Sequence, residues 1–306
     1  MVAVDIRQLD SAPRLRGIRP GRGYRIFQAV NGFVLTGLVV LTLFPFVNLI
    51  ARSFSAEHYI RTGKVNLVPR GFNLTTYQHV MADHLFWTGY RNTVIYTVVA
   101  TAISMVLTTT YAYVLSKRHL RGRGLLIGIA VFTMFFNGGI IPNYVLIGKL
   151  GMRDTIWAIV LPNAINVFNL LVMKAFFESL PVELEEAASV DGMDTFRILW
   201  RIVLPLSKAV IATMILFYAV FFWNDWFPAF LYMDKQDLFP VTVYLRNIIL
   251  SATSVGNENM NSDLALQIGA NIQAVTIVLT VLPIMCVYPF IQRYFVSGVM
   301  LGAVKS

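Results

Sequence analysis

The sequence Glu186-Ala-Ala-Ser-Val-Asp-Gly192, followed after nine more residues by Ile202-Val-Leu-Pro205, is the longest polar interruption in a chain built mostly of membrane-length apolar segments. Acidic side chains are concentrated in and around it: Glu183, Glu185, Glu186, Asp191 and Asp194. The sequence on both sides returns to long apolar runs. The stretch therefore marks the place where the membrane part of the protein meets something soluble.

The composition of the chain is that of a membrane protein. Of its 306 residues, 57% are hydrophobic and only 13% are charged, and the mean hydropathy is +0.64. These values lie outside the range of soluble globular domains. The formal net charge of +9 does not point to nucleic acid, because the basic residues cluster beside apolar segments instead of forming one continuous face. The single cysteine, Cys286, cannot form an intrachain disulfide.

Six apolar segments are long enough to cross a bilayer, whose hydrocarbon core of about 30 Å requires about 20 helical residues. We expect spans over approximately 26–50, 93–115, 125–146, 155–176, 209–231 and 272–295. The sequence therefore predicts an all-α integral membrane fold with six transmembrane helices. It consists of a six-span domain over residues 26–306, preceded by a basic cytoplasmic tail over residues 1–25.

The basic residues also predict an orientation. If the N-terminus lies inside, most of the 25 lysines and arginines fall on the inner side of the membrane. This bias follows the positive-inside rule, so we expect both termini in the cytoplasm. The same orientation places residues 181–205 in the cytoplasm, and it places a loop from about Tyr232 to Gly269 outside.

Local chemistry around Gly192 predicts two short helices joined by a tight turn. Pro181 can open the first helix, Gly192 can adopt a left-handed conformation that ends it, and the second can begin near Asp194. An amphipathic helix lying on the membrane surface is the alternative. It is disfavoured because its acidic side chains would face an anionic leaflet. We therefore expect a docking element over residues 181–205 that meets another protein.

The second short helix is expected to carry one apolar stripe, which packs on the membrane helices or on a partner. Its members recur at helical spacing: Phe196, Leu199, Trp200 and Val203. Pro205 is expected to break the helical path before the fifth span.

The complete pattern of Glu-Ala-Ala, Gly192 and Ile-x-Leu-Pro resembles the coupling loop of permease subunits from binding-protein-dependent ABC importers. Other stretches resemble the smaller permease subunit of the maltose-type carbohydrate-uptake family: 92–96, 108–118, 136–142, 223–228 and 288–305. The resemblance covers the chain from about Phe27 onwards and implies a type I ABC importer permease fold.

The resemblance further implies a transport subunit, and not an enzyme, in a bacterial-type cytoplasmic (inner) membrane. Such subunits work with a homologous second permease, two ATP-binding subunits and an extracytoplasmic sugar-binding protein. The sequence has no Gly-x4-Gly-Lys-Ser/Thr loop for phosphates. ATP and Mg would therefore be bound by the partner ATPase, whose hydrolysis drives alternating access for a carbohydrate, and no cofactor is expected on this chain. The implied ATPase-coupling positions are Glu186, Ala187, Ala188, Asp191, Gly192, Ile202, Leu204 and Pro205.

Candidates for the substrate path or its gate are Trp223, Asn224, Asp225 and Trp226. Asp225 is the only acidic residue within an expected span, and ionisable groups at membrane depth usually face a cavity or a polar partner. Carboxylate and amide groups suit sugar hydroxyls, and indole rings suit the apolar face of a pyranose. A structural role as interface anchors and helix-to-helix contacts stays open.

Three asparagines of the outer loop are candidates for docking the binding protein: Asn257, Asn259 and Asn261. The four histidines show no metal-ligand spacing, so no metal site is expected.

Two alternatives remain for the function. One is an ABC importer permease for a solute other than a sugar, since such permeases share the coupling loop. The other is a gradient-driven secondary transporter, which would work without ATP. The sequence does not specify which sugar is carried, because selectivity can lie in the binding protein or in the second permease.

Overall fold

The protein is described by a computed structural model that covers residues 21–254 and 271–286. The chain divides into two compact units, residues 1–49 and residues 50–306, which are described separately. The described residues form helices and loops, with a single isolated β-bridge between Ser55 and Phe72 and no strand.

The helices of the first half of the chain are α1 (Arg22–Ser53), α2 (Glu57–Arg61), α3 (Thr75–Ala82), α4 (His84–Ser116), α5 (Arg123–Phe135) and α6 (Ile140–Lys149). They are followed by α7 (Trp157–Val160), α8 (Val167–Glu178), α9 (Val182–Val190), α10 (Thr195–Ile198), the π-helix η2 (Leu199–Val203) and α11 (Leu204–Leu206). The last are α12 (Lys208–Asn224), α13 (Phe227–Tyr232), the 3-10 helix η3 (Gln236–Leu238), α14 (Val241–Ser254) and a helix over Asn271–Cys286.

The described part of the first unit is α1 up to Leu49, preceded by Gly21. Large hydrophobic side chains are exposed on every side of this helix, including Phe33, Leu41 and Phe46. A helix that is apolar all round is suited to a lipid surrounding. The first expected span is thereby confirmed as a continuous apolar helix long enough to cross a membrane.

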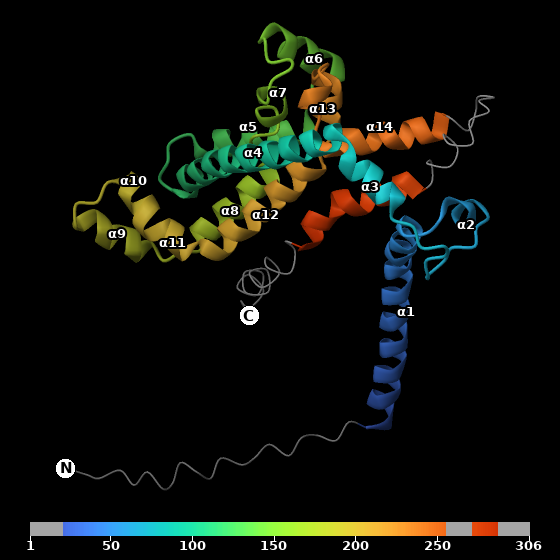
Figure 1. Ribbon diagram of the computed structural model, residues 1–306. Coiled ribbons are helices and arrows are strands. Elements are labelled where there is room, and N and C mark those ends of the chain that lie inside the picture. The colour runs from blue at the N-terminus through green and yellow to red at the C-terminus, as the bar shows by residue number, and fades with distance from the viewer. Residues whose placement is uncertain (1–20, 255–270, 287–306) are drawn as a thin grey trace. The chain divides into compact units, whose positions relative to one another are not determined.

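Helix α4 is the centre of the second unit, where it packs against α8, α12 and α14 (Figure 1). Its buried face is made of small and hydroxylated residues, among them Ala100, Ser104 and Thr108, which let neighbouring helices approach closely. The hydroxyls of Thr108 and Tyr218 lie 2.6 Å apart, and the Tyr218 hydroxyl accepts a 3.0 Å hydrogen bond from the backbone N–H of Asn166. The second expected span is confirmed as part of this helix.

The third expected span, 125–146, is not one helix. Helices α5 and α6 meet at an angle of 114°. Gly139 has a φ of +91°, and the side-chain oxygen of Asn137 accepts a 2.9 Å hydrogen bond from the N–H of Gly139. This Asx turn satisfies the backbone in a bent conformation that the Gly-Gly pair allows.

The fourth and fifth expected spans, 155–176 and 209–231, are interrupted as well. Residues 161–166 separate α7 from α8; there Pro162 lacks a backbone donor, and Asn166 caps α8 through its side-chain oxygen. Helix α12 ends at Asn224, and α13 begins only at Phe227. Hydropathy did not predict these breaks because each window remains apolar across them.

Of the sixth expected span, 272–295, only the helix up to Cys286 lies within the described residues. The part of the chain that the structure covers therefore contains two continuous membrane-length helices, or four if each strongly bent pair counts as one span.

The expected outer loop after Tyr232 is partly helical, since it contains η3 and α14. It is fastened to α4: the amide of Asn92 donates to the carbonyl oxygens of Asp237 (2.6 Å) and Phe239 (3.2 Å). The Tyr96 hydroxyl donates to the Leu238 carbonyl at 2.9 Å. These contacts hold the start of the segment in one position relative to α4.

Candidate functional site

The docking element expected over 181–205 begins with the two predicted short helices. Helix α9 starts directly after Pro181, and the chain then turns at Gly192, whose φ is +80°. Helix α10 is capped by Asp194, whose carboxylate accepts a 2.8 Å hydrogen bond from the N–H of Arg197. Figure 1 shows α9 and α10 together at one end of the second unit. The prediction of two short helices is confirmed.

The apolar stripe of the docking element is divided between two faces, which corrects the prediction of a single stripe. Leu199 and Val203 are buried in a cluster with residues of α4 and α8, whereas Phe196 and Trp200 are 65% and 58% exposed, with ring centroids 6.1 Å apart. The internal face therefore holds the element on the helices, and the outer face remains available to a partner.

The alanines of the motif differ in the same way. Ala188 is only 4% exposed and belongs to the buried cluster, so it packs within this chain. Glu186, Ala187 and Asp191 are exposed, and Val190 beside them is 88% exposed. The surface offered by α9 is therefore acidic, with the exposed apolar side chains of Val182, Leu184 and Val190 beside the carboxylates.

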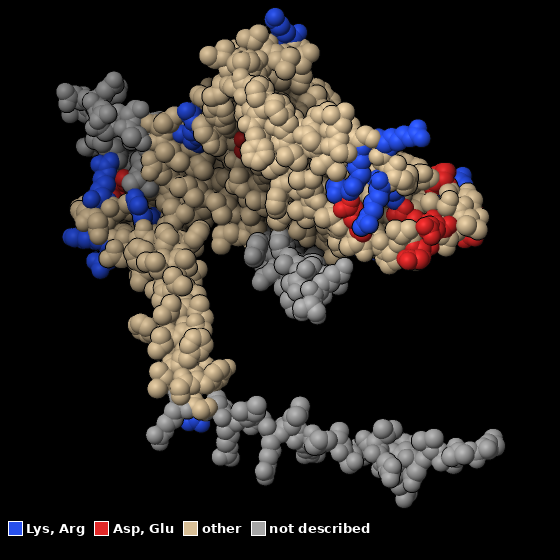
Figure 2. All heavy atoms as spheres, turned by 180° about the vertical axis from the view of Figure 1, so that it is seen from behind, with Lys and Arg blue, Asp and Glu red and all other residues tan. Residues whose placement is uncertain are grey.

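Ion pairs fasten the docking element and α8 to the neighbouring helix ends. Lys117, just after α4, pairs with Glu185 of α9, and Arg123 at the start of α5 pairs with Glu178 of α8. Glu178 also accepts from Lys174 at 2.9 Å. Figure 2 shows acidic and basic side chains gathered at this end of the unit, whereas the other charged groups visible on this face are mostly basic. These pairs could not be predicted from the sequence because most of the partners are far apart in the chain.

The helical path breaks before the fifth span, as expected, but it continues through Pro205 and breaks two residues later. Pro205 lies within α11, after the π-helix η2, and the bend of 86° between this segment and α12 falls at Ser207. Pro205 lacks a backbone N–H, and it follows directly on the wider helical turn of η2 and Leu204. Ile202 and Leu204 are partly buried against the core cluster, and Pro205 itself is exposed.

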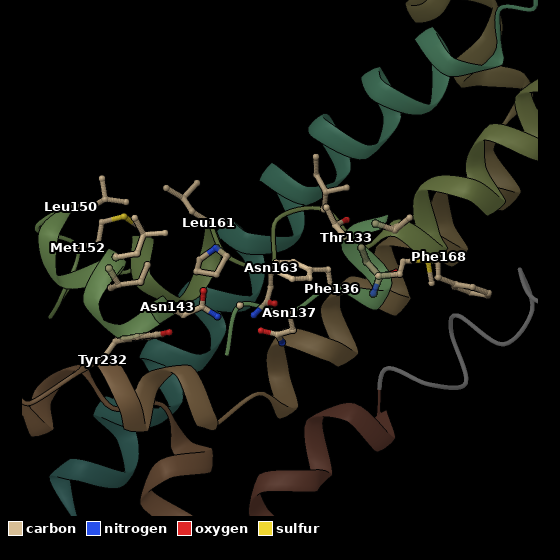
Figure 3. Close-up of a pocket in the computed structure, with 18 residues that line it drawn as sticks. Thr133, Phe136, Asn137, Asn143, Leu150, Met152, Leu161, Asn163, Phe168 and Tyr232 are labelled. Carbon is tan, nitrogen blue, oxygen red and sulfur yellow. The ribbon is translucent and has the colours of Figure 1, made fainter. Parts of the chain in front are cut away.

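A cavity of about 790 Å³ lies where the chain is interrupted between α5 and α6 and between α7 and α8. We call it the amide cavity, because four of the residues that line it are Asn137, Asn143, Asn163 and Asn166. Figure 3 shows three of these amides and the hydroxyl of Tyr232 directed toward a common space. The rings of Phe136 and Phe168 also line the cavity.

The four amides of the cavity differ in their partners. The side-chain oxygens of Asn137 and Asn166 each accept a backbone hydrogen bond at a helix break. The side-chain amides of Asn143 and Asn163 form no hydrogen bond with another described residue. These two groups therefore keep all their donors and acceptors available.

The family described as the inner membrane component of binding-protein-dependent transport systems matches residues 86–300. The chain belongs to this family. The matched residues include the docking element, the residues that line the amide cavity and the central helix α4 from Phe86 onwards.

Two relatives from Bacillus subtilis (strain 168) are similar to this inner membrane component over nearly its whole length. This chain is 41% identical to "Protein LplC", over 92% of this chain and 96% of the relative. It is 38% identical to the polygalacturonan/rhamnogalacturonan transport system permease protein YtcP, over 90% of this chain and 97% of that protein. The second relative is named as a permease, which agrees with the resemblance of the docking element to permease coupling loops.

A solved structure has the same fold. It is the crystal structure of a bacterial ABC transporter involved in the import of the acidic polysaccharide alginate. The matched chain is 34% identical with a TM-score of 0.81, and the alignment covers 90% of this chain and 98% of the other. The type I ABC permease fold expected from the resemblance is therefore confirmed.

The predicted substrate-path residues of this inner membrane component lie at the break between α12 and α13. The indole N–H of Trp223 donates to the Thr280 carbonyl at 3.4 Å, and the amide of Asn224 donates to the Val220 carbonyl of its own helix at 2.8 Å. The guanidinium of Arg246 lies 4.9 Å from the Trp226 ring centre.

Asp225 is partly buried and accepts a hydrogen bond from the N–H of Phe227. These four residues are not among those that line the amide cavity. Their assignment to the substrate path stays a prediction, as does the docking role of Asn257, Asn259 and Asn261, which lie outside the described residues.

Proposed function

We propose that the chain is the transmembrane permease subunit of an ATP-driven importer for a carbohydrate, most simply an oligosaccharide. Its similarity to a permease named for polygalacturonan and rhamnogalacturonan, and to an importer of alginate, carries the assignment to carbohydrates. The docking element supports coupling to a separate ATPase, because it presents an exposed surface on an element fastened to the membrane helices.

The proposed topology has six spans with both termini in the cytoplasm. In this topology α1 and α4 are the first two spans, each interrupted helix pair is one of the next three, and the helix that begins at Asn271 is the last. Breaks within a span are compatible with the bilayer where the irregular backbone faces protein or a water-filled cavity. The excess of basic residues in the inner segments supports the orientation.

The proposed partners are a homologous second permease, two ATP-binding subunits that hold ATP and Mg, and an extracytoplasmic sugar-binding protein. Among the predicted coupling positions, the exposed ones would contact the ATPase: Glu186, Ala187, Asp191, Gly192 and Pro205. The partly or fully buried ones, Ala188, Ile202 and Leu204, would instead hold the element on its own core.

In the proposed coupling step, closure of the two ATPase subunits moves the docking element as a unit. Glu185 and Glu178 would transmit this movement to the ends of α4 and α5 through their ion pairs with Lys117 and Arg123. ATP then shifts the equilibrium between the inward-open and outward-open states of the complex. The size of the shift depends on how much more tightly ATP binds to one state than to the other.

Uptake by proteoliposomes containing the complete complex tests the function. We expect uptake of an oligogalacturonide to require internal ATP and the external binding protein. Substitution of the phosphate-binding lysine of the ATPase subunit should abolish uptake. Uptake driven by a proton or sodium gradient without ATP would contradict the proposal and favour a secondary transporter. ATP-dependent uptake of a non-sugar solute, with none of any saccharide, would refute the carbohydrate assignment alone.

A further inference from the structure

We propose that the amide cavity is a saccharide contact site of this subunit, which recognises hydroxyl groups and not charge. The inference rests on the proposed function and deepens it by assigning residues and a mode of recognition. The assignment differs from the sequence prediction, which placed the substrate path at Trp223 to Trp226.

The position of the cavity supports a solute site. Two breaks in otherwise apolar stretches, at Asn137 to Gly139 and at 161–166, open into it together, and Tyr232 closes one wall. Inside a bilayer, non-helical backbone is tolerated only where it is buried in protein or lines a water-filled cavity. Interrupted helices that meet at one place are a recurrent feature of solute sites in transporters.

The free amides supply the recognition chemistry. Each side chain of Asn143 and Asn163 offers two N–H donors and one carbonyl acceptor, which matches neighbouring hydroxyls of a sugar ring. Asn143 is exposed and Asn163 is partly exposed, so both amides can be reached by a ligand in the cavity. A polar ligand can form hydrogen bonds with both amides, whereas lipid tails cannot.

The remaining wall supplies apolar surface. Phe136 and Phe168 can pack on the apolar face of a pyranose, and the Tyr232 hydroxyl adds a polar group on the other side of the amides. The volume of about 790 Å³ falls in the range of about 300–1,000 Å³ typical of small-molecule sites.

The cavity contains no formal charge. None of the described residues that line it is Lys, Arg, Asp or Glu. It therefore has no cation to pair with a uronate carboxylate, although the structurally similar importer carries an acidic polysaccharide. Recognition here depends on hydroxyl geometry, so acidic and neutral oligosaccharides with matching hydroxyls both bind, with little dependence on salt.

Cysteine protection tests the assignment in the complete reconstituted complex. In a Cys286→Ser background, Asn163→Cys and Asn224→Cys are each labelled with N-ethylmaleimide, with and without an oligogalacturonide or maltotetraose. We expect either sugar to slow labelling of Asn163→Cys about tenfold at roughly ten times its dissociation constant. Labelling of Asn224→Cys, at the end of α12, should not change.

Several outcomes would overturn the inference. If neither sugar changes the labelling of Asn163→Cys, the amide cavity is not a saccharide site. If the sugars protect Asn224→Cys instead, the substrate path lies at the break between α12 and α13. If Asn163→Cys is labelled in the isolated chain but never in the complex, a partner subunit fills the cavity. ATP-dependent uptake is measured in the same vesicles: its absence refutes the proposed function, whereas uptake without protection refutes only the site.

Discussion

The docking element and the amide cavity lie in the same unit, but their polar groups are used in opposite ways. At the turn around Gly192, Asp194 caps the next helix and Glu185 is paired with Lys117. At the breaks around the cavity, Asn143 and Asn163 keep their amides unbonded to other described residues. An element that transmits movement is stiffer when its polar groups are bonded within the chain. A binding site, in contrast, needs donors and acceptors that are available to the ligand.

This difference predicts a separation of effects. Variants of the docking element should change the coupling between hydrolysis and uptake without changing the saccharide concentration that gives half-maximal uptake. Variants of the cavity should do the reverse.

The largest effect is expected for Gly192→Val. An added Cβ would meet no atom within 4 Å, so the cost comes from the backbone, whose φ is +80°. A β-branched residue in this conformation costs about 1–3 kcal/mol, enough to displace the turn. Uptake should fall about tenfold or more while ATP hydrolysis continues. Gly192→Asn is the matched control, because asparagine tolerates left-handed backbone; wild-type uptake by the valine variant would refute the hinge role.

The next effect is expected for the double variant Asn143→Ala, Asn163→Ala. Loss of both amides should raise the half-saturating saccharide concentration about tenfold, since hydrogen bonds of this kind contribute about 0.5–1.5 kcal/mol each. The number of ATP molecules hydrolysed per sugar should stay constant. Thr110→Ala serves as the control, because the Thr110 hydroxyl is bonded within its own helix. A lower maximal rate of uptake with an unchanged half-saturating concentration would contradict the predicted separation between coupling in the docking element and binding in the amide cavity.

A smaller effect is expected for Glu178→Gln. This change removes the carboxylate shared by Arg123 and Lys174, which are only partly exposed. We expect a loss of about 1–2 kcal/mol, seen as a Tm lower by a few degrees in thermal unfolding of the purified complex. Glu183→Gln provides the comparison, since Glu183 is exposed and has no ion pair in the described part of the chain. Equal Tm values for the two variants would show that the pairs do not hold the element.

The smallest effect is expected at Asp154, in the turn between α6 and α7. The N–H of Asp154 donates to the Tyr232 carbonyl at 3.1 Å, and its carboxylate accepts from the N–H of Asp234 at 2.7 Å. This bond lowers the pKa of Asp154, with Lys235 and Arg153 adding in the same direction.

A folded-state pKa below the unfolded value gives stability that is present above about pH 4 and lost as pH falls through the folded pKa. The Tm of the wild type should therefore decrease slightly when the pH falls below about 4, and part of this decrease should be absent in Asp154→Asn. An identical Tm profile for the wild type and the variant would show that the carboxylate makes no contribution.

Local signals in the sequence were sufficient for the docking element. Pro181, Gly192 and Asp194 each act on the backbone within a few residues, so the two short helices and the turn between them could be predicted. The ion pair of Lys117 with Glu185 could not, because it joins the end of α4 to α9, and only the tertiary structure brings these distant residues together.

The cavity had local signals that were not recognised. The Asn137-Gly-Gly sequence and Pro162 both favour a break, but each lies in a segment whose average hydropathy predicts a continuous span. Even with both breaks predicted, nothing in the sequence indicates that Asn143 and Asn163 line the same space.

The sequence by itself determined that this protein is a helical membrane component with a docking element of the ABC importer type. Apolar length, glycine conformation and helix capping act over short distances and can be recognised along the chain. Only the tertiary structure decided which faces of that element are buried and where unbonded amides gather, because both depend on packing between segments that are distant in sequence.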